Sequence, residues 1–168
     1  MSKMLSVISL FIAFSSWALT NPADNYSQVT TGIYRGARPS DAGLKALAQS
    51  GIKTVVNIDN DAKSITQERK VAAQLGLKFI SIPLSGFFAP SDAQTAAVQA
   101  KLNDPSLYPI FLHCKHGEDR TGLMVGLYRV YSQSWSPEDA YEEMIDKGFH
   151  KILIFLNHYY EETTGFED

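Results

Sequence analysis

The chain has 168 residues, of which 45% are hydrophobic and 20% are charged. These proportions are typical of a folded globular domain and exclude a disordered or collagen-like chain, and the length suits one hydrophobic core. The formal net charge of −3 provides no basic field for nucleic acid, so we expect no nucleic-acid partner. An anionic ligand would have to be held by a local cluster of donors.

The first twenty residues differ from the rest of the chain. Lys3 precedes an apolar run from Met4 to Leu19, and the polar segment 21–24 follows it. This pattern is typical of a secretory signal peptide, and the run is shorter than the ~20 strongly apolar residues of a membrane span. We therefore expect residues 1–20 to be a signal peptide, cleaved between 18 and 23, and 21–168 to be one domain. The expected location is the bacterial periplasm or the extracellular space, with no stable membrane span after cleavage.

Apolar periodicity and turn residues predict alternating strands and helices along the mature chain. The predicted strands, each short and rich in β-branched or aromatic residues, are 29–35, 53–58, 78–82 and 109–113. This alternation indicates a single α/β domain whose central, largely parallel sheet is flanked by helices, with a helical C-terminal third. The predicted helices begin at Ser40 or Asp41, run over 64–75 and from Ser91 or Asp92 to about 102, start again near Arg120 and after Ser136, and end with 151–160.

One segment between a predicted strand and a predicted helix has the composition of an anion-binding loop. Inward-turned backbone N–H groups and the helix N-terminus, which carries about half a positive charge, hold a phosphate there without many lysines. The same field favours the thiolate form of a cysteine, which is the nucleophilic form. Cys114 is the only cysteine, so no intramolecular disulfide competes for it. The segment reads His113-Cys114-Lys115-His116-Gly117-Glu118-Asp119-Arg120-Thr121-Gly122.

The residues of this loop have separate expected roles. Arg120 follows the cysteine after five intervening residues, and its planar guanidinium is suited to bind two phosphate oxygens and to stabilise the transition state. The Thr121 hydroxyl is expected to stabilise the thiolate as a leaving group, and His113 to order the loop from behind. The expected phosphate-binding set is Lys115, His116, Gly117, Glu118, Asp119 and Arg120.

This pattern of His-Cys, five residues and Arg-Thr-Gly resembles the signature of the protein tyrosine phosphatase superfamily. The segment Ile33-Tyr34-Arg35-Gly36-Ala37-Arg38-Pro39 is similar to the opening of atypical dual-specificity phosphatases, so the resemblance covers most of residues 29–147. It implies a phosphoric monoester hydrolase that works through a phosphocysteine intermediate, with Cys114 and Arg120 as catalytic residues. It implies neither a metal nor a cofactor.

Members of this superfamily usually carry a general acid on a separate loop before the cysteine, and that loop departs from the pattern here. The segment 84–90 contains no acidic residue. The loop around Asp119 resembles that of myotubularin-type inositide phosphatases, which implies that Asp119 is the acid; a helix-capping role is its alternative. Asp92 is the second candidate, although a helix N-cap is its more ordinary role. Glu118, Asp59 and Asp61 are the remaining candidates.

The substrate is expected to be an inositol polyphosphate. Lys115 and His116 add positive charge to the loop, and Arg35, Arg38 and Lys63 are candidates to surround its mouth. The chain is also similar to secreted bacterial phytases, which act on inositol hexakisphosphate.

Glu118 opposes this reading because it repels a crowded polyanion. A phosphotyrosine or dual-specificity protein phosphatase is the alternative enzyme, with Phe87 and Phe88 as walls for an aromatic ring, although core packing is the more ordinary role of both. A pseudophosphatase that only binds phosphate, and a rhodanese-like sulfur transferase, are further alternatives.

Overall fold

The computed structural model describes residues 21–167, so the predicted signal peptide lies outside the described residues. A five-stranded sheet in the order β1-β2-β5-β3-β4 forms the centre of the domain. Strands β2, β5, β3 and β4 are parallel to their neighbours, and only β1 is antiparallel, to β2. The expected α/β class with a largely parallel sheet is thus confirmed. The strands are β1 (Ser27–Thr30), β2 (Ile33–Gly36), β3 (Thr54–Asn57), β4 (Lys78–Ser81) and β5 (Ile110–His113).

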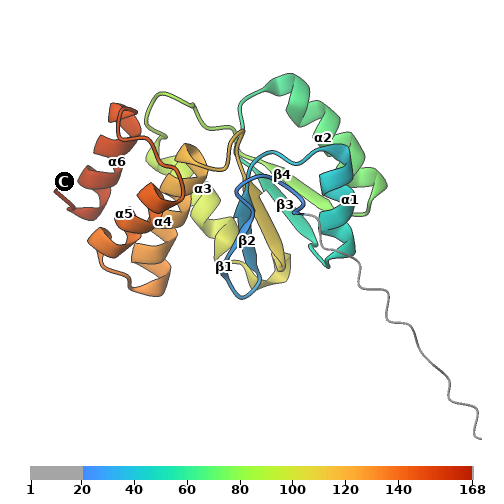
Figure 1. Ribbon diagram of the computed structural model, residues 1–168, viewed down its shortest axis with the longest axis horizontal. Coiled ribbons are helices and arrows are strands. Elements are labelled where there is room, and N and C mark those ends of the chain that lie inside the picture. Colours follow the sequence, from blue (N-terminus) through green and yellow to red (C-terminus); the bar gives the residue numbers. More distant parts are fainter. Residues whose placement is uncertain (1–20, 168) are drawn as a thin grey trace, which may run out of the picture.

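Helices cover both faces of this sheet (Figure 1). Two helices, α1 (Asp41–Gln49) and α2 (Ala62–Gln74), lie on one side, and the others lie on the opposite side. Residues of α4 are buried along most of the helix because the sheet packs on one flank and α3, α5 and α6 surround the other. The helices of the second side are α3 (Asp92–Leu102), α4 (Asp119–Gln133), α5 (Pro137–Asp146) and α6 (Ile154–Thr164), with a short 3-10 turn over Pro105–Leu107.

The core has two parts because successive residues of a buried strand point to opposite faces of the sheet. Val55 and Phe111 pack with the apolar side chains of α1 and α2, whereas Val56, Ile110 and Leu112 pack with those of α3 and α4. All five of these strand side chains are fully buried. β5 therefore lies in the middle of the sheet, and α4 packs over it. The loop that joins them lies at the carboxyl ends of the parallel strands.

Three predicted elements have boundaries that differ from the observed ones by two residues or more. Residues 29–35 form parts of two strands rather than one, because Gly32 adopts a positive φ of 82° and turns the chain into a hairpin. Helix α2 begins at Ala62, since the Asp61 side chain accepts the N–H groups of Lys63 and Ser64 as the N-cap. The last helix runs over Ile154–Thr164 instead of 151–160.

The remaining caps follow the sequence signals. Ser40 caps α1, Ser136 caps α5 with Pro137 in the first turn, and Ser91 forms a capping box with Gln94 at the start of α3. Within residues 21–167, no helix combines the length and the apolar character that a bilayer crossing requires.

Candidate functional site

The loop from Cys114 to Glu118 lies at the carboxyl edge of the parallel strands. It follows β5 directly and leads into α4, and the segment after β3 and the segment after β2 lie at the same edge. Ligands of open α/β sheets bind at this edge, because the loops there converge while the strands hold them rigidly. The fold therefore brings together three stretches that are far apart in the sequence, around residues 36–38, 58–60 and 114–120.

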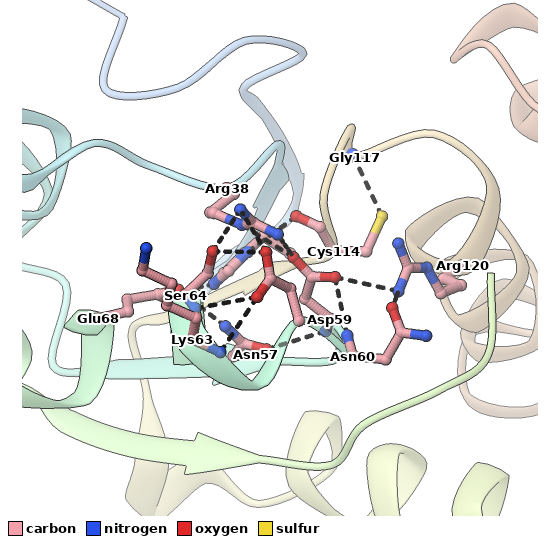
Figure 2. Close-up of polar contacts among 12 residues, drawn as sticks. Arg38, Asn57, Asp59, Asn60, Lys63, Ser64, Glu68, Cys114, Gly117 and Arg120 are labelled. Atoms are coloured by element: carbon pink, nitrogen blue, oxygen red, sulfur yellow. Dashed lines mark hydrogen bonds and ion pairs between the residues drawn. The ribbon is translucent and has the colours of Figure 1, made fainter. Parts of the chain in front are cut away.

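The Cys114 side chain is buried at the base of this loop, and its sulfur has a built-in donor. The backbone N–H of Gly117 donates to Sγ over 3.3 Å (Figure 2). Gly117 has a φ of +76°, and a Cβ atom on it would lie 2.3 Å from the carbonyl carbon of Gly36. Only glycine satisfies both conditions. The close packing of the loop against the end of β2 therefore holds the Gly117 N–H within reach of the Cys114 sulfur.

Helix α4 begins at Asp119 without a side-chain cap. Its N-cap residue, Glu118, makes no capping hydrogen bond to the first turn. The first N–H groups of a helix have no intrahelical acceptor, and together they form an anion site. Lys115 and His116 are exposed on the outer side of the loop. A strand end, a tight loop and a helix N-terminus without a side-chain cap thus meet here, and anion binding by them stays a prediction.

Arg120 lies in the first turn of α4 and lines the same pocket as Cys114. One of its terminal nitrogens, Nη1, donates to Asp59 Oδ1 at 3.2 Å, to Asn60 Oδ1 at 3.0 Å and to the Leu84 carbonyl at 3.2 Å. Figure 2 shows the guanidinium held on this side, next to the Cys114 side chain. The arginine is therefore oriented before any phosphate binds, which lowers the entropic cost of binding.

Asp59 connects this arginine to a second one. Arg38 forms an ion pair with Asp59 and a second, longer one with Asp61 at 3.6 Å, and it donates to Ser64 Oγ at 2.6 Å. Burial raises the pKa of Asp59, but the hydrogen bonds from Arg38 and the Asn60 N–H and the charges of Arg38 and Arg120 hold it below its usual value. Asp59, named in the sequence only as a minor acid candidate, is an ionised anchor for both arginines.

A network of buried polar side chains supports the loop from behind. Of its members, the sequence predicted a supporting role only for His113. The imidazole Nδ1 lies 3.0 Å from the Cys114 carbonyl oxygen, and Nε2 lies 2.7 Å from Glu68 Oε1. Asn57 donates to the other Glu68 oxygen at 2.8 Å. Both imidazole nitrogens thus face oxygen atoms, so the ring links Glu68 to the Cys114 carbonyl behind the loop. Nothing in the sequence marks Glu68, because it lies on a helix of mostly exposed residues.

The prediction that Arg35 surrounds the mouth of the loop is wrong. Its side chain is only 2% exposed and lies beneath the loop, where Nη2 donates to the Gly117 carbonyl at 2.7 Å. Burial lowers the pKa of Arg35, and the charges of Glu143 and Cys114 oppose that shift. The residue alternates with apolar neighbours along β2, and its position in the strand directs it into the interior. It contributes positive charge from below rather than a substrate contact.

The other peripheral candidates do not line the pocket that contains Cys114. Arg38 is engaged by Asp59 and Asp61, and Lys63 lies in the first turn of α2. Asp92 lies in the first turn of α3 and accepts a hydrogen bond from Tyr159 at 3.2 Å. The Thr121 hydroxyl is fully buried and has no hydrogen-bond partner among the described residues. Its expected role at the sulfur stays a prediction.

The pocket over Cys114 has a volume of about 470 Å³. Asp119 is the one carboxylate among the described residues that line it, and its Oδ1 accepts two hydrogen bonds of 2.9 Å from His150, one from the backbone N–H and one involving the ring Nδ1. His150 was not singled out in the sequence, where it stands in a turn before the last helix. The pocket is lined by Asn60, Gly86, Phe87, Cys114, Lys115, His116, Asp119, Arg120, His150, Ile152 and Leu153.

Apolar side chains form the outer lip of the pocket. Phe87 is 71% exposed and Ile152 is 83% exposed, and both line the pocket. Phe88 and Phe155 are also exposed, and their rings lie 5.5 Å apart. The expectation that Phe87 and Phe88 pack into the core is therefore wrong. Ser85 instead accepts their backbone N–H groups through Oγ, which holds this loop in a turn with the aromatic rings outward.

Comparison with known proteins agrees with this geometry. TpbA of Pseudomonas aeruginosa, a dual specificity protein phosphatase, is 31% identical over 136 residues, which are 80% of this chain and 60% of TpbA. The inositol diphosphatase SIW14 of Saccharomyces cerevisiae is 30% identical over 129 residues, 73% of this chain and 44% of that protein. This chain thus aligns with less than two thirds of the length of either relative.

A solved structure and a family model extend the comparison. The crystal structure of a Cys-to-Ser variant of P. aeruginosa TpbA in complex with pTyr superposes with a TM-score of 0.70 at 27% identity, covering 84% of this chain and 85% of that one. The family model PTP-NADK, described as a DSP-PTPase phosphatase fused to NAD+ kinase, matches residues 7–154. Because this match covers most of the sequence, the chain belongs to the PTP-NADK family of DSP-PTPase phosphatases.

Proposed function

We propose that the chain is a cysteine-dependent phosphomonoesterase in which Cys114 is the nucleophile. The observation that carries this proposal is the Gly117 N–H donating to the Cys114 sulfur at the base of a pocket that Arg120 also lines. The thiolate attacks phosphorus, the ester P–O bond breaks, and the phosphoryl group is held on sulfur. Water then attacks phosphorus, the P–S bond breaks, and the thiolate leaves. Arg120 and the first N–H groups of α4 bind the equatorial oxygens in both steps.

The test is turnover of an aryl phosphate by the purified chain. Cys114→Ser should lower kcat by about 10⁴-fold or more, since removing a catalytic nucleophile costs effects of this order. The same variant should still bind inorganic phosphate, because the backbone donors and Arg120 remain. A phosphate ester activity that survives in Cys114→Ser would show that another group performs the reaction.

Among phosphate esters, the pocket fits a monoester with an apolar or aromatic leaving group, such as phosphotyrosine. The lip formed by Phe87 and Ile152 offers exposed apolar surface in the same pocket as Cys114. Two arginines expected at the mouth are used elsewhere, Arg35 beneath the loop and Arg38 on Asp59. The name of TpbA and its complex with pTyr point in the same direction.

An inositol polyphosphate is the second candidate substrate, and it was the one favoured by the sequence. Lys115 lines the pocket and supplies positive charge, His116 and His150 line it as well, and the relative SIW14 is an inositol diphosphatase. A panel of phosphotyrosine peptides, an inositol pyrophosphate and inositol hexakisphosphate separates the candidates. Catalytic efficiency concentrated on the inositol compounds would place the inositol polyphosphate first and the aryl phosphate second.

Export to the periplasm or the extracellular space is proposed from the sequence alone. The support is Lys3 followed by the apolar run from Met4 to Leu19. Expression of the full chain in a bacterium, followed by cell fractionation and N-terminal sequencing, tests it. A mature N-terminus between residues 19 and 24 is expected, whereas a cytoplasmic chain that retains Met4 to Leu19 would contradict the proposal.

A further inference from the structure

The reaction proposed above requires a proton for the leaving oxygen, and the pocket offers few groups that can supply it. The segment 84–90, where this family of folds usually carries an acid, contributes only Gly86 and Phe87 to the pocket. Asp92 faces Tyr159, and Asp59 is an anchor for two arginines. The pocket carboxylate that remains is Asp119, and it is hydrogen-bonded to His150.

Asp119 lies beneath His150 rather than facing the pocket by itself. The Asp119 side chain is 17% exposed, and the His150 side chain that covers it is 57% exposed. Asp119 Oδ1 is hydrogen-bonded to the His150 backbone N–H and lies 2.9 Å from Nδ1 of the ring. A carboxylate that accepts two such bonds is held as an acceptor. The group presented to a bound ester is therefore the imidazole.

The pairing also determines which imidazole proton is available. When Nδ1–H is directed at Asp119, the second proton of an imidazolium is on Nε2, which has no hydrogen-bond partner recorded among the described residues. This is the arrangement in which a carboxylate fixes the tautomer and orientation of a catalytic histidine. Gly148, two residues earlier, packs its backbone against the Glu118 side chain, so the turn that carries His150 is fixed to the start of α4.

We propose that His150 is the general acid of this phosphatase and that Asp119 is its positioning residue. In the first step the thiolate of Cys114 attacks phosphorus, the ester P–O bond breaks, and the Nε2 proton of His150 moves to the leaving oxygen, which departs as an alcohol or phenol. In the second step the neutral imidazole takes a proton from the attacking water while the P–S bond breaks, which restores both the imidazolium and the thiolate. This inference rests on the proposed function and replaces direct proton donation by Asp119.

The electrostatic environment favours the charged imidazole. The hydrogen bond to Asp119 and its charge raise the pKa of His150 above its usual value, burial opposes this slightly, and the charge of Glu118 adds to it. A raised pKa extends to higher pH the range in which the acid is protonated, and the acid is lost as pH rises through that pKa. The ionisable groups around His150 are Glu118 and Asp119 at the start of α4 and, across the pocket, Cys114, Lys115, His116 and Arg120.

The experiment compares His150→Gln with the wild type on two classes of ester. An alkyl phosphate needs the proton, because an alkoxide is a poor leaving group, whereas 4-nitrophenyl phosphate needs it little. His150→Gln should lower kcat/KM for the alkyl ester by about 100-fold, the low end of general acid catalysis, and for the nitrophenyl ester by about threefold or less. It should also remove the decline of the alkyl ester kcat/KM at alkaline pH. Asp119→Asn should shift that decline to lower pH.

The controls separate this inference from its rivals. His158→Gln is the matched control, since His158 is exposed on α6, pairs with Glu161 and Glu162 and does not line the pocket. Equal losses of His150→Gln on both esters, with weakened inhibition by inorganic phosphate, would indicate a structural role and overturn the proposal. Full activity of His150→Gln on the alkyl phosphate, together with a large loss in Asp119→Asn, would also overturn the proposal. A wild-type chain without phosphatase activity would instead refute the proposed function.

Discussion

The two sides of the loop from Cys114 to Glu118 are built in opposite ways. Behind it lie the buried side chains of His113, Glu68 and Arg35; His113 pairs with Glu68, and Nη2 of Arg35 donates to the loop itself. In front of it lies an exposed apolar lip that includes Phe87 and Ile152. Charged groups thus lie buried behind the loop as well as in the pocket, whereas these exposed apolar side chains lie at the pocket's outer lip. The difference teaches that buried contacts hold the loop in place, whereas the proposed preference for an aryl ester rests on exposed side chains.

The largest expected effect concerns Arg120, which lines the pocket and is held by Asp59 and Asn60. Arg120→Lys keeps the charge but loses the planar donor set, so Nη1 can no longer bind Asp59 and Asn60 while the other nitrogens bind phosphate. We expect kcat to fall by about 10²- to 10³-fold, the loss typical of one preorganised transition-state donor. Arg69→Lys is the control, because Arg69 on α2 lies over the ring of Phe79 on β4 and does not line the pocket. A loss below tenfold would mean that a point charge is sufficient.

Asp59 anchors Arg120, and its charge makes the stability of the domain depend on pH. The pKa of Asp59 is held below its usual value in the fold, so its contribution is present above the unfolded pKa of about 3.9 and is lost as pH falls through the folded value. Asp59→Asn should cost about 1–3 kcal/mol at pH 7, because two arginines lose a buried acceptor. Urea unfolding at pH 7 and pH 3 measures this.

The difference between Asp59→Asn and the wild type should shrink at the lower pH. Asp139→Asn, an exposed change in α5, should stay within about 0.5 kcal/mol of the wild type. A difference between Asp59→Asn and the wild type that is independent of pH would show that the carboxylate charge is not what stabilises the site.

Glu68 tests whether the network behind the loop matters to the sulfur. Glu68→Gln retains the size of the side chain and its contact with Asn57 but removes the charge that faces His113. We expect a loss of about 1–2 kcal/mol in stability, the cost of an impaired buried hydrogen bond. We also expect a fall of up to about tenfold in kcat/KM on every ester, because the His113 contact to the Cys114 carbonyl is weakened. Glu142→Gln, on the exposed side of α5, should change neither quantity.

Whether a part of the fold or of the site could be predicted depends on whether it is marked by a local sequence pattern or only by contacts between distant segments. The loop was predictable because a strand, a cysteine, an arginine at fixed spacing and a helix start are all local patterns. The rear network was not, since Glu68 and Asn57 meet His113 only through the pairing of β3 with β5 and the packing of α2. His150 was missed for the same reason: its contact with Asp119 is a tertiary contact between a turn and a helix end.

Misplaced residues have a second cause, which is that side-chain direction is decided by packing rather than by residue type. An arginine in a short strand next to glycine reads as a surface cation, yet the register of β2 against β5 directs Arg35 under the loop. Two adjacent phenylalanines read as core residues, yet the turn closed by Ser85 exposes both. Residue type indicates whether a side chain favours burial or exposure, and the local backbone geometry determines which of the two it adopts.

The smallest expected effect concerns the front side, and it would sharpen the comparison most. Phe87→Ala combined with Ile152→Ala removes apolar surface that a leaving group contacts, worth about 1 kcal/mol for a partly covered side chain. The KM for a phosphotyrosine peptide should therefore rise about three- to tenfold, while kcat and the free energy of unfolding stay nearly unchanged. Phe155→Ala is the control, since Phe155 is exposed next to Phe88 but does not line the pocket.

A methyl phosphate or an inositol phosphate distinguishes substrate contact from a general effect of the Phe87 and Ile152 substitutions. Neither ester has apolar surface to lose, so its KM should not change in the double variant, and the preference for the aryl ester should fall by the same three- to tenfold factor. If kcat falls as well, the lip also positions the segment 84–90, whose Leu84 carbonyl accepts a hydrogen bond from Arg120. The exposed side chains would then help to orient the catalytic arginine. The division between buried residues that hold the loop and exposed residues that contact the substrate would not hold.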